Sequence, residues 1–119
     1  MATSYREITS SVSASLAKLR ADMPETTRGF TALAQAAIKD GALDKKTKEL
    51  IAMALSVASR CDPCIGFHAE ALVKLGTTRA EFEDMLGMCI YMGGGPSLMY
   101  AGHALDVVVE FGGAPAREV

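Results

Sequence analysis

Apolar residues recur every three or four positions along most of this chain, and no segment alternates convincingly between apolar and polar residues. That spacing matches the 3.6-residue turn of an α-helix, whereas a half-buried strand would place apolar residues at every second position. The β-branched run at 107–109 alone would suit a strand, but helical periodicity flanks it on both sides. The pattern therefore predicts an all-α protein with no sheet.

Residues that start or stop helices divide this pattern into six predicted helices. Thr78 followed three positions later by Glu81 forms a capping box, which marks a helix start. Pro24 and Asp44 also suit helix starts, because Pro is tolerated in the first turn and an Asp side chain can accept from an unpaired amide. The predicted stops are Gly41, Gly76 and the segment Gly93-Gly94-Gly95-Pro96.

These helices should form one domain, with an N-terminal helix in residues 1–23, a core at 24–113 and a flexible tail at 114–119. The third helix is apolar nearly all round at 50–58, so we expect it at the centre of the bundle. The second helix is expected to bury one face, formed by Phe30, Leu33, Ala34, Ala37 and Ile38.

Composition predicts that the chain associates with copies of itself. Half of its 119 residues are hydrophobic, and the third, fifth and sixth predicted helices carry them over more than one face. A single small core gives each helix one buried stripe, so a second subunit should cover the surplus. The surplus residues are Met85, Met88, Met92, Met99 and Val107.

Charge and hydropathy exclude several classes of partner. The net charge is −2, so no basic field attracts nucleic acid or anionic lipid. No apolar run reaches the length of a membrane span, and residues 1–7 lack the basic and apolar regions of a signal peptide. We therefore expect a cytoplasmic protein that binds neither nucleic acid nor membranes.

A Cys-x-x-Cys pair, Cys61 and Cys64, supplies the clearest chemistry. If Cys61 or Asp62 caps the following helix, both sulfurs lie at its N-terminus, where unpaired amides and the helix dipole favour a thiolate. His68 follows Cys64 by four positions, so the two can share one helix face. An activated dithiol beside a proton acceptor suits thiol–disulfide or peroxide chemistry.

Other uses of the Cys and His residues are less well supported. A zinc site would have to recruit Cys89 or His103, because the chain has no second Cys-x-x-Cys pair and no His-x-x-x-His pair. We expect neither a metal nor another cofactor. Cys89 lies in an apolar run and should be an inert core thiol, and His103 should be a packed or interface residue.

Glu49 stands where the apolar run of the third predicted helix begins. Composition alone favours a solvated surface carboxylate paired with Lys45 or Lys46. The third helix leads directly into the dithiol, however, and the two helices must pack as neighbours. A carboxylate at that level could instead pair with an imidazole of the next helix.

Glu49 followed by Cys61-x-x-Cys64-x-x-x-His68 resembles the signature of the alkyl hydroperoxidase D-like branch of the carboxymuconolactone decarboxylase family. The segment Tyr91-Met92-Gly93-Gly94-Gly95-Pro96 is similar to the Tyr-x-Gly-x-Pro turn of that family. The resemblance covers most of the chain after Pro24. It implies an all-helical trimer or hexamer that reduces a peroxide or disulfide substrate at the expense of a dithiol reductant.

The resemblance also implies a role for each residue of the signature. Cys64 would attack the substrate and Cys61 would resolve the oxidised sulfur, forming a redox disulfide. Glu49 and His68 would relay protons. Pro63 departs from the pattern, because the alkyl hydroperoxidase D motif has a histidine directly before its second cysteine.

Two alternative functions remain open from the sequence. A lactone decarboxylase is suggested only by the name of the family, and decarboxylation does not require a dithiol. A redox-sensing protein would close its dithiol once, without turnover.

Overall fold

The computed structural model describes residues 4–113, and all regular secondary structure in that range is helical. No helix in this range combines the length and the hydropathy that a membrane-spanning segment requires. The predicted tail at 114–119 lies outside the described residues. The six helices confirm the all-α prediction, and they are α1 (Tyr5–Asp22), α2 (Pro24–Ile38), α3 (Lys45–Ala58), α4 (Asp62–Lys74), α5 (Arg79–Gly93) and α6 (Gly95–Glu110).

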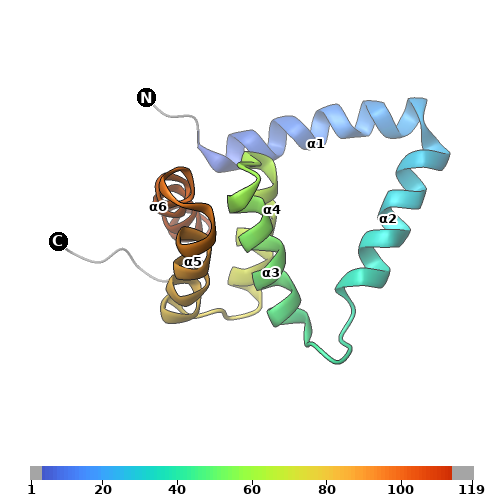
Figure 1. The fold of residues 1–119 in the computed structure, drawn as a ribbon. Coiled ribbons are helices and arrows are strands. Elements are labelled where there is room, and N and C mark those ends of the chain that lie inside the picture. The colour runs from blue at the N-terminus through green and yellow to red at the C-terminus, as the bar shows by residue number, and fades with distance from the viewer. Residues whose placement is uncertain (1–3, 114–119) are drawn as a thin grey trace.

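The hydrophobic core lies where α3, α4, α5 and α6 pack together (Figure 1). Met53 and Val57 of α3 are fully buried, as is Ile65 of α4. Each such side chain contributes about 1.5–3 kcal/mol when it is buried, so the core holds α3 and α4 firmly against each other. The predicted central place of α3 is confirmed, although Ile51 and Leu55 remain exposed beside α2.

Side-chain caps begin α3 and α5 where the sequence predicted. Hydrogen bonds from Thr47 to the Asp44 carboxylate lower the pKa of Asp44, and the bond from the backbone N–H is 2.8 Å long. Thr78 Oγ1 accepts from the Glu81 amide at 3.2 Å, and the Glu81 carboxylate accepts from the Thr78 amide at 2.9 Å. Both halves of the predicted capping box are therefore present.

Helix α1 packs against α4 near its start and then extends away from the bundle, so that α1, α2 and α3 outline a triangle (Figure 1). Within residues 4–113, α2 packs only against α1 and α3. The prediction of a buried face on α2 is therefore wrong for the single chain. Phe30 and Leu33 are 71% and 64% exposed, Ala34 and Ala37 are also exposed, and Ile38 is only partly buried. The physical reason is that α1 carries the start of α2 beyond the reach of the core.

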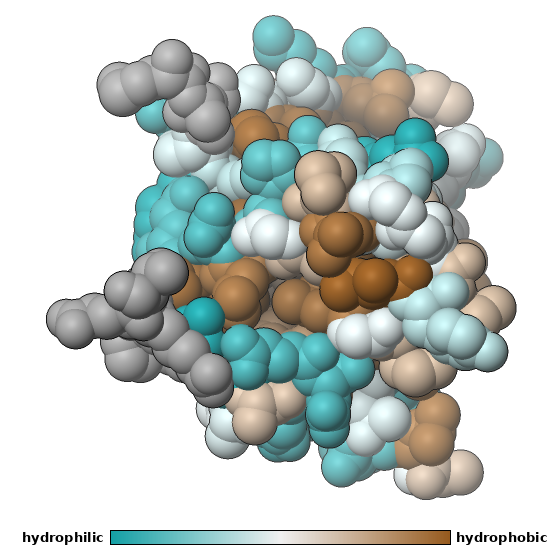
Figure 2. Space-filling view, turned by 60° about the vertical axis from the view of Figure 1, so that its left-hand side comes forward, coloured by the Kyte–Doolittle hydropathy of each residue, from teal (hydrophilic) through white to brown (hydrophobic). Residues whose placement is uncertain are grey.

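Apolar side chains also reach the surface of α5 and α6. Met88, Met92 and Met99 are mostly exposed, in agreement with the predicted surplus. Val107 is buried in the core and Met85 is partly buried against it, so the prediction was wrong for these two residues, whose side chains face the bundle. Figure 2, with the side of α5 and α6 brought forward, shows hydrophobic surface among hydrophilic residues.

Candidate active site

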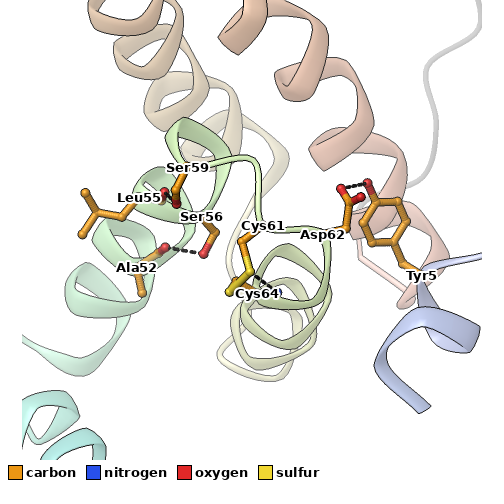
Figure 3. The surroundings of a disulfide bond; sticks show 8 residues. All are labelled: Tyr5, Ala52, Leu55, Ser56, Ser59, Cys61, Asp62 and Cys64. Atoms are coloured by element: carbon orange, nitrogen blue, oxygen red, sulfur yellow. Dashed lines mark hydrogen bonds between the residues drawn. A yellow bond between two sulfur atoms is a disulfide. The ribbon is translucent and has the colours of Figure 1, made fainter. Parts of the chain in front are cut away.

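The two cysteines lie at the start of α4, where they form a disulfide with their Cα atoms 5.2 Å apart. Cys61 is the N-cap residue of α4, and its Sγ accepts from the backbone N–H of Cys64 at 3.3 Å (Figure 3). Both residues are partly exposed. The pair thus occupies the helix N-terminus, the position that stabilises a thiolate once the disulfide opens.

A tight turn between α3 and α4 brings Cys61 to this position. The backbone N–H of Cys61 donates to the carbonyl of Ser56 at 3.0 Å, and that of Arg60 donates to Val57 at 3.1 Å. These two bonds are those of a Schellman helix end. Arg60 takes the left-handed conformation of the motif, with φ of 56°, where glycine is usual. The end of α3 therefore leads into the dithiol without an intervening loop.

Glu49 of α3 and His68 of α4 meet where these two helices pack. Glu49 Oε2 lies 2.7 Å from His68 Nδ1, and Glu49 is only 6% exposed. The interpretation of Glu49 as a solvated partner of Lys45 or Lys46 is therefore wrong, and Lys46 pairs with Glu81 at 2.6 Å. Because a carboxylate only accepts, Nδ1 donates to Glu49, and Nε2 is the nitrogen left to exchange a proton.

A cavity of about 520 Å³ opens beside the Glu49–His68 pair, between α2 and α3. Its walls are mostly apolar, with Ile38 contributed by α2 and Ile51 and Leu55 by α3. The His68 side chain is 33% exposed, so a molecule in the cavity can reach the imidazole. The cysteines are not among the residues that line this cavity.

The other candidate thiol and imidazole are engaged elsewhere. Cys89 is buried with its Sγ 3.8 Å from the carbonyl oxygen of Ala54, and burial raises the pKa of this thiol. The ring of His103 meets that of Tyr100 edge-on, with 5.7 Å between the centroids. In the described part of the chain, no three His, Cys, Asp or Glu side chains gather closely enough to hold a metal ion.

One contact at the dithiol was missed by the sequence analysis. The hydroxyl of Tyr5, on the first residue of α1, donates to Oδ1 of Asp62 at 3.0 Å (Figure 3). Burial and this hydrogen bond raise the pKa of Tyr5, so the hydroxyl keeps its proton. The two residues are 57 positions apart, and no local pattern near Tyr5 points to Asp62.

Comparison with known sequences indicates a family for this chain. The model of the carboxymuconolactone decarboxylase family matches residues 24–107, which include Glu49, both cysteines of the dithiol and His68. An uncharacterized protein of Cupriavidus necator is 42% identical over 82 residues, covering 69% of this chain and 73% of that protein. Another, from the cox locus of Paracoccus denitrificans, is 34% identical over 107 residues, covering 84% of this chain and 96% of that protein.

Comparison with solved structures agrees. A carboxymuconolactone decarboxylase family protein from Legionella pneumophila is 62% identical, with a TM-score of 0.88 over 90% of this chain and 96% of that chain. A family protein from Thermotoga maritima is 27% identical, with a TM-score of 0.76 over 86% of this chain and 87% of that chain. The Thermotoga protein has been suggested to take part in an antioxidative response.

Proposed function

Because this chain belongs to the carboxymuconolactone decarboxylase family and places a dithiol beside a Glu–His pair, we propose that it is a thiol-dependent peroxidase or disulfide reductase. The 2.7 Å bond between His68 Nδ1 and the buried Glu49, one helical turn from Cys64, is the observation that carries this proposal. A lactone decarboxylase would have no use for two cysteines held within bonding distance.

In the proposed cycle, Cys64 attacks a hydroperoxide as a thiolate. Its sulfur takes one oxygen, the O–O bond breaks, and His68 relays a proton to the departing oxygen. The thiol of Cys61 then attacks the sulfenic acid on Cys64, which releases water and forms the disulfide seen in the structure. An external dithiol supplies two electrons and two protons to open the disulfide again.

Glu49 fixes the imidazole for this relay. A buried carboxylate is costly without partners, and Glu49 is bonded to His68 in the interface of α3 and α4. The bond sets the orientation of the ring and directs Nε2 away from the carboxylate. Since the His68 side chain is partly exposed in the cavity, Nε2 can exchange its proton with substrate or solvent.

The proposal extends to an antioxidant role in the cytoplasm. The suggested antioxidative role of the Thermotoga maritima relative is consistent with peroxide reduction. Cytoplasmic thiols are kept reduced, so a disulfide at this site would be reopened there and the cycle could continue.

Steady-state consumption of tert-butyl hydroperoxide with excess dithiothreitol tests this function. We expect many turnovers per chain, and no consumption after the dithiol has been reduced and alkylated. A single equivalent of peroxide consumed per chain, followed by arrest, would contradict the enzyme and support the redox sensor instead.

We propose further that the protein works as a homo-oligomer, a trimer or a hexamer. Phe30 and Leu33 on α2 and Met92 and Met99 near the α5–α6 break would otherwise remain in water. Light scattering at micromolar concentration should give several times the chain mass of 12.5 kDa. Leu33→Glu should reduce that mass, because a charge in an apolar interface is expensive to bury. A stable, fully active monomer would contradict this prediction.

A further inference from the structure

The start of α1 is fastened to the end of α6. The carboxylate of Glu110 accepts from the backbone N–H groups of Tyr5 and Arg6 at 3.1 and 2.7 Å. The guanidinium of Arg6 also donates to the carbonyl of Glu110 and lies 4.7 Å from the centroid of the Phe111 ring. These contacts fix the main chain of Tyr5 relative to the core, and this limits the positions that the Tyr5 hydroxyl can occupy.

Gly66, two positions after Cys64, lets α1 lie directly against the dithiol helix. A Cβ at this position would come within 2.5 Å of the Thr9 methyl group on α1 and 3.8 Å of the Tyr5 ring. Helix α1 precedes residues 24–107, the part of the chain that matches the family model. Helix α1, which lies outside the matched region, therefore packs against the dithiol motif at Gly66, between Cys64 and His68.

The Tyr5 hydroxyl reaches the residue that stands between the two cysteines. In Figure 3 the Asp62 carboxylate points toward Tyr5, on the opposite side of the α4 N-terminus from the disulfide. A carboxylate in the first turn of α4 competes with a thiolate for the unpaired amides, and its charge opposes a second negative charge nearby. The hydrogen bond holds this carboxylate away from the sulfurs.

We propose that Tyr5 is a positioning residue that sets the reduction potential of the Cys61–Cys64 disulfide through its hydrogen bond to Asp62. The inference rests on the proposed function, because it requires a dithiol that opens and closes. When two glutathione molecules reduce the disulfide, two electrons and two protons pass to the protein, which gives two protein thiols and one glutathione disulfide. A thiolate in that product is more stable when the Asp62 carboxylate is held away, so Tyr5 favours the reduced form.

Equilibration of the full chain with glutathione buffers measures this effect directly, without any peroxidase assay. Tyr5→Phe keeps the ring in the α1–α4 contact and removes only the hydroxyl. We expect the equilibrium constant for reduction to fall about threefold, which corresponds to about 15 mV for a two-electron couple. The pKa of the attacking thiol should rise by roughly half a unit. Tyr91→Phe, at an exposed tyrosine of α5, is the matched control and should behave like the parent protein.

Asp62→Asn tests whether the hydroxyl acts through the carboxylate. Removing the charge should shift the equilibrium toward the reduced form, and adding Tyr5→Phe to this variant should cause no further shift. Circular dichroism checks that each variant is folded. If Tyr5→Phe does not fold, the equilibrium shift of Asp62→Asn alone is used as the test.

Three results would overturn the inference. The first is a Tyr5→Phe protein with the same equilibrium constant for reduction as the parent protein. The second is a change caused by Tyr5→Phe that is equally large in the Asp62→Asn background. The third is an Asp62→Asn protein whose equilibrium constant equals that of the parent. A parent dithiol that fails to equilibrate with glutathione at all would be recognised separately, since it would overturn the proposed function and this inference together.

Discussion

Replacing Cys64 with Ser should abolish peroxide turnover, whereas replacing Cys61 with Ser should leave one oxidised sulfur per chain. A Ser hydroxyl cannot be oxidised to a sulfenic acid, so Cys64→Ser loses the sulfur that takes the peroxide oxygen. Cys61→Ser keeps the attack but has no thiol to resolve the product, so a sulfenic acid accumulates. Mass spectrometry after one equivalent of peroxide, with dimedone as the trapping reagent, should find one adduct, on Cys64.

Cys89→Ser is the matched control for these two variants. Because burial raises the pKa of the Cys89 thiol, this variant should keep normal turnover. In the parent protein, alkylation should find Cys89 reduced after the Cys61–Cys64 pair has oxidised. Oxidation of Cys89 before the pair would contradict the assignment of the site.

The trapping experiment also decides which cysteine is the nucleophile. The Sγ of Cys61 accepts from the amide of Cys64, so the end of α4 could equally stabilise a thiolate on Cys61. Trapping of sulfenic acid in the Cys64→Ser variant, and none in Cys61→Ser, would transfer the attacking role to Cys61.

Glu49→Gln and His68→Gln should each slow peroxide turnover by roughly 10²–10⁴-fold while the fold is preserved. A Gln at position 49 can still accept from Nδ1, but its neutral amide forms a weaker hydrogen bond than the carboxylate does and fixes the imidazole ring less firmly. His68→Gln removes the proton relay itself. Initial rates at saturating peroxide, compared after circular dichroism has shown equal helix content, measure both effects.

Two further variants control for the loss of a charge and of an imidazole. Glu70→Gln removes a carboxylate from α4 that forms a partly exposed ion pair with Lys74, and exposed pairs of this kind contribute little to stability. His103→Gln removes the other imidazole of the chain. Both controls should keep near-normal rates. Near-normal rates in Glu49→Gln and His68→Gln as well would give the buried pair a structural role only.

Much of the secondary structure of this fold is specified by residues that are close together in the chain. The Thr78–Glu81 capping box and the Asp44 cap involve partners three positions apart, and both are present in the structure. The position of the dithiol at a helix start was predictable for the same reason. Cys61 is the N-cap of α4, and its Sγ accepts from the backbone N–H of Cys64, three positions later. Capping chemistry acts within one helical turn, so a sequence displays it directly.

Tertiary packing decided what those local patterns left open or indicated wrongly. Glu49 stands near Lys45 and Lys46 in the sequence, and only the packing of α3 on α4 buries it against His68. Tyr5 and Asp62, 57 positions apart, meet because α1 crosses the start of α4.

The sequence alone predicted six helices, the caps that begin α3 and α5, a dithiol at a helix start and the residues of the family signature. It did not determine which helix faces are covered, and the apolar face of α2, with Phe30 and Leu33, therefore came out exposed in the single chain. The physical reason is that helix formation and capping depend on neighbours within a turn or so. The placement of one helix against another depends on the summed burial of many side chains from distant parts of the chain, and that sum exists only in the folded structure.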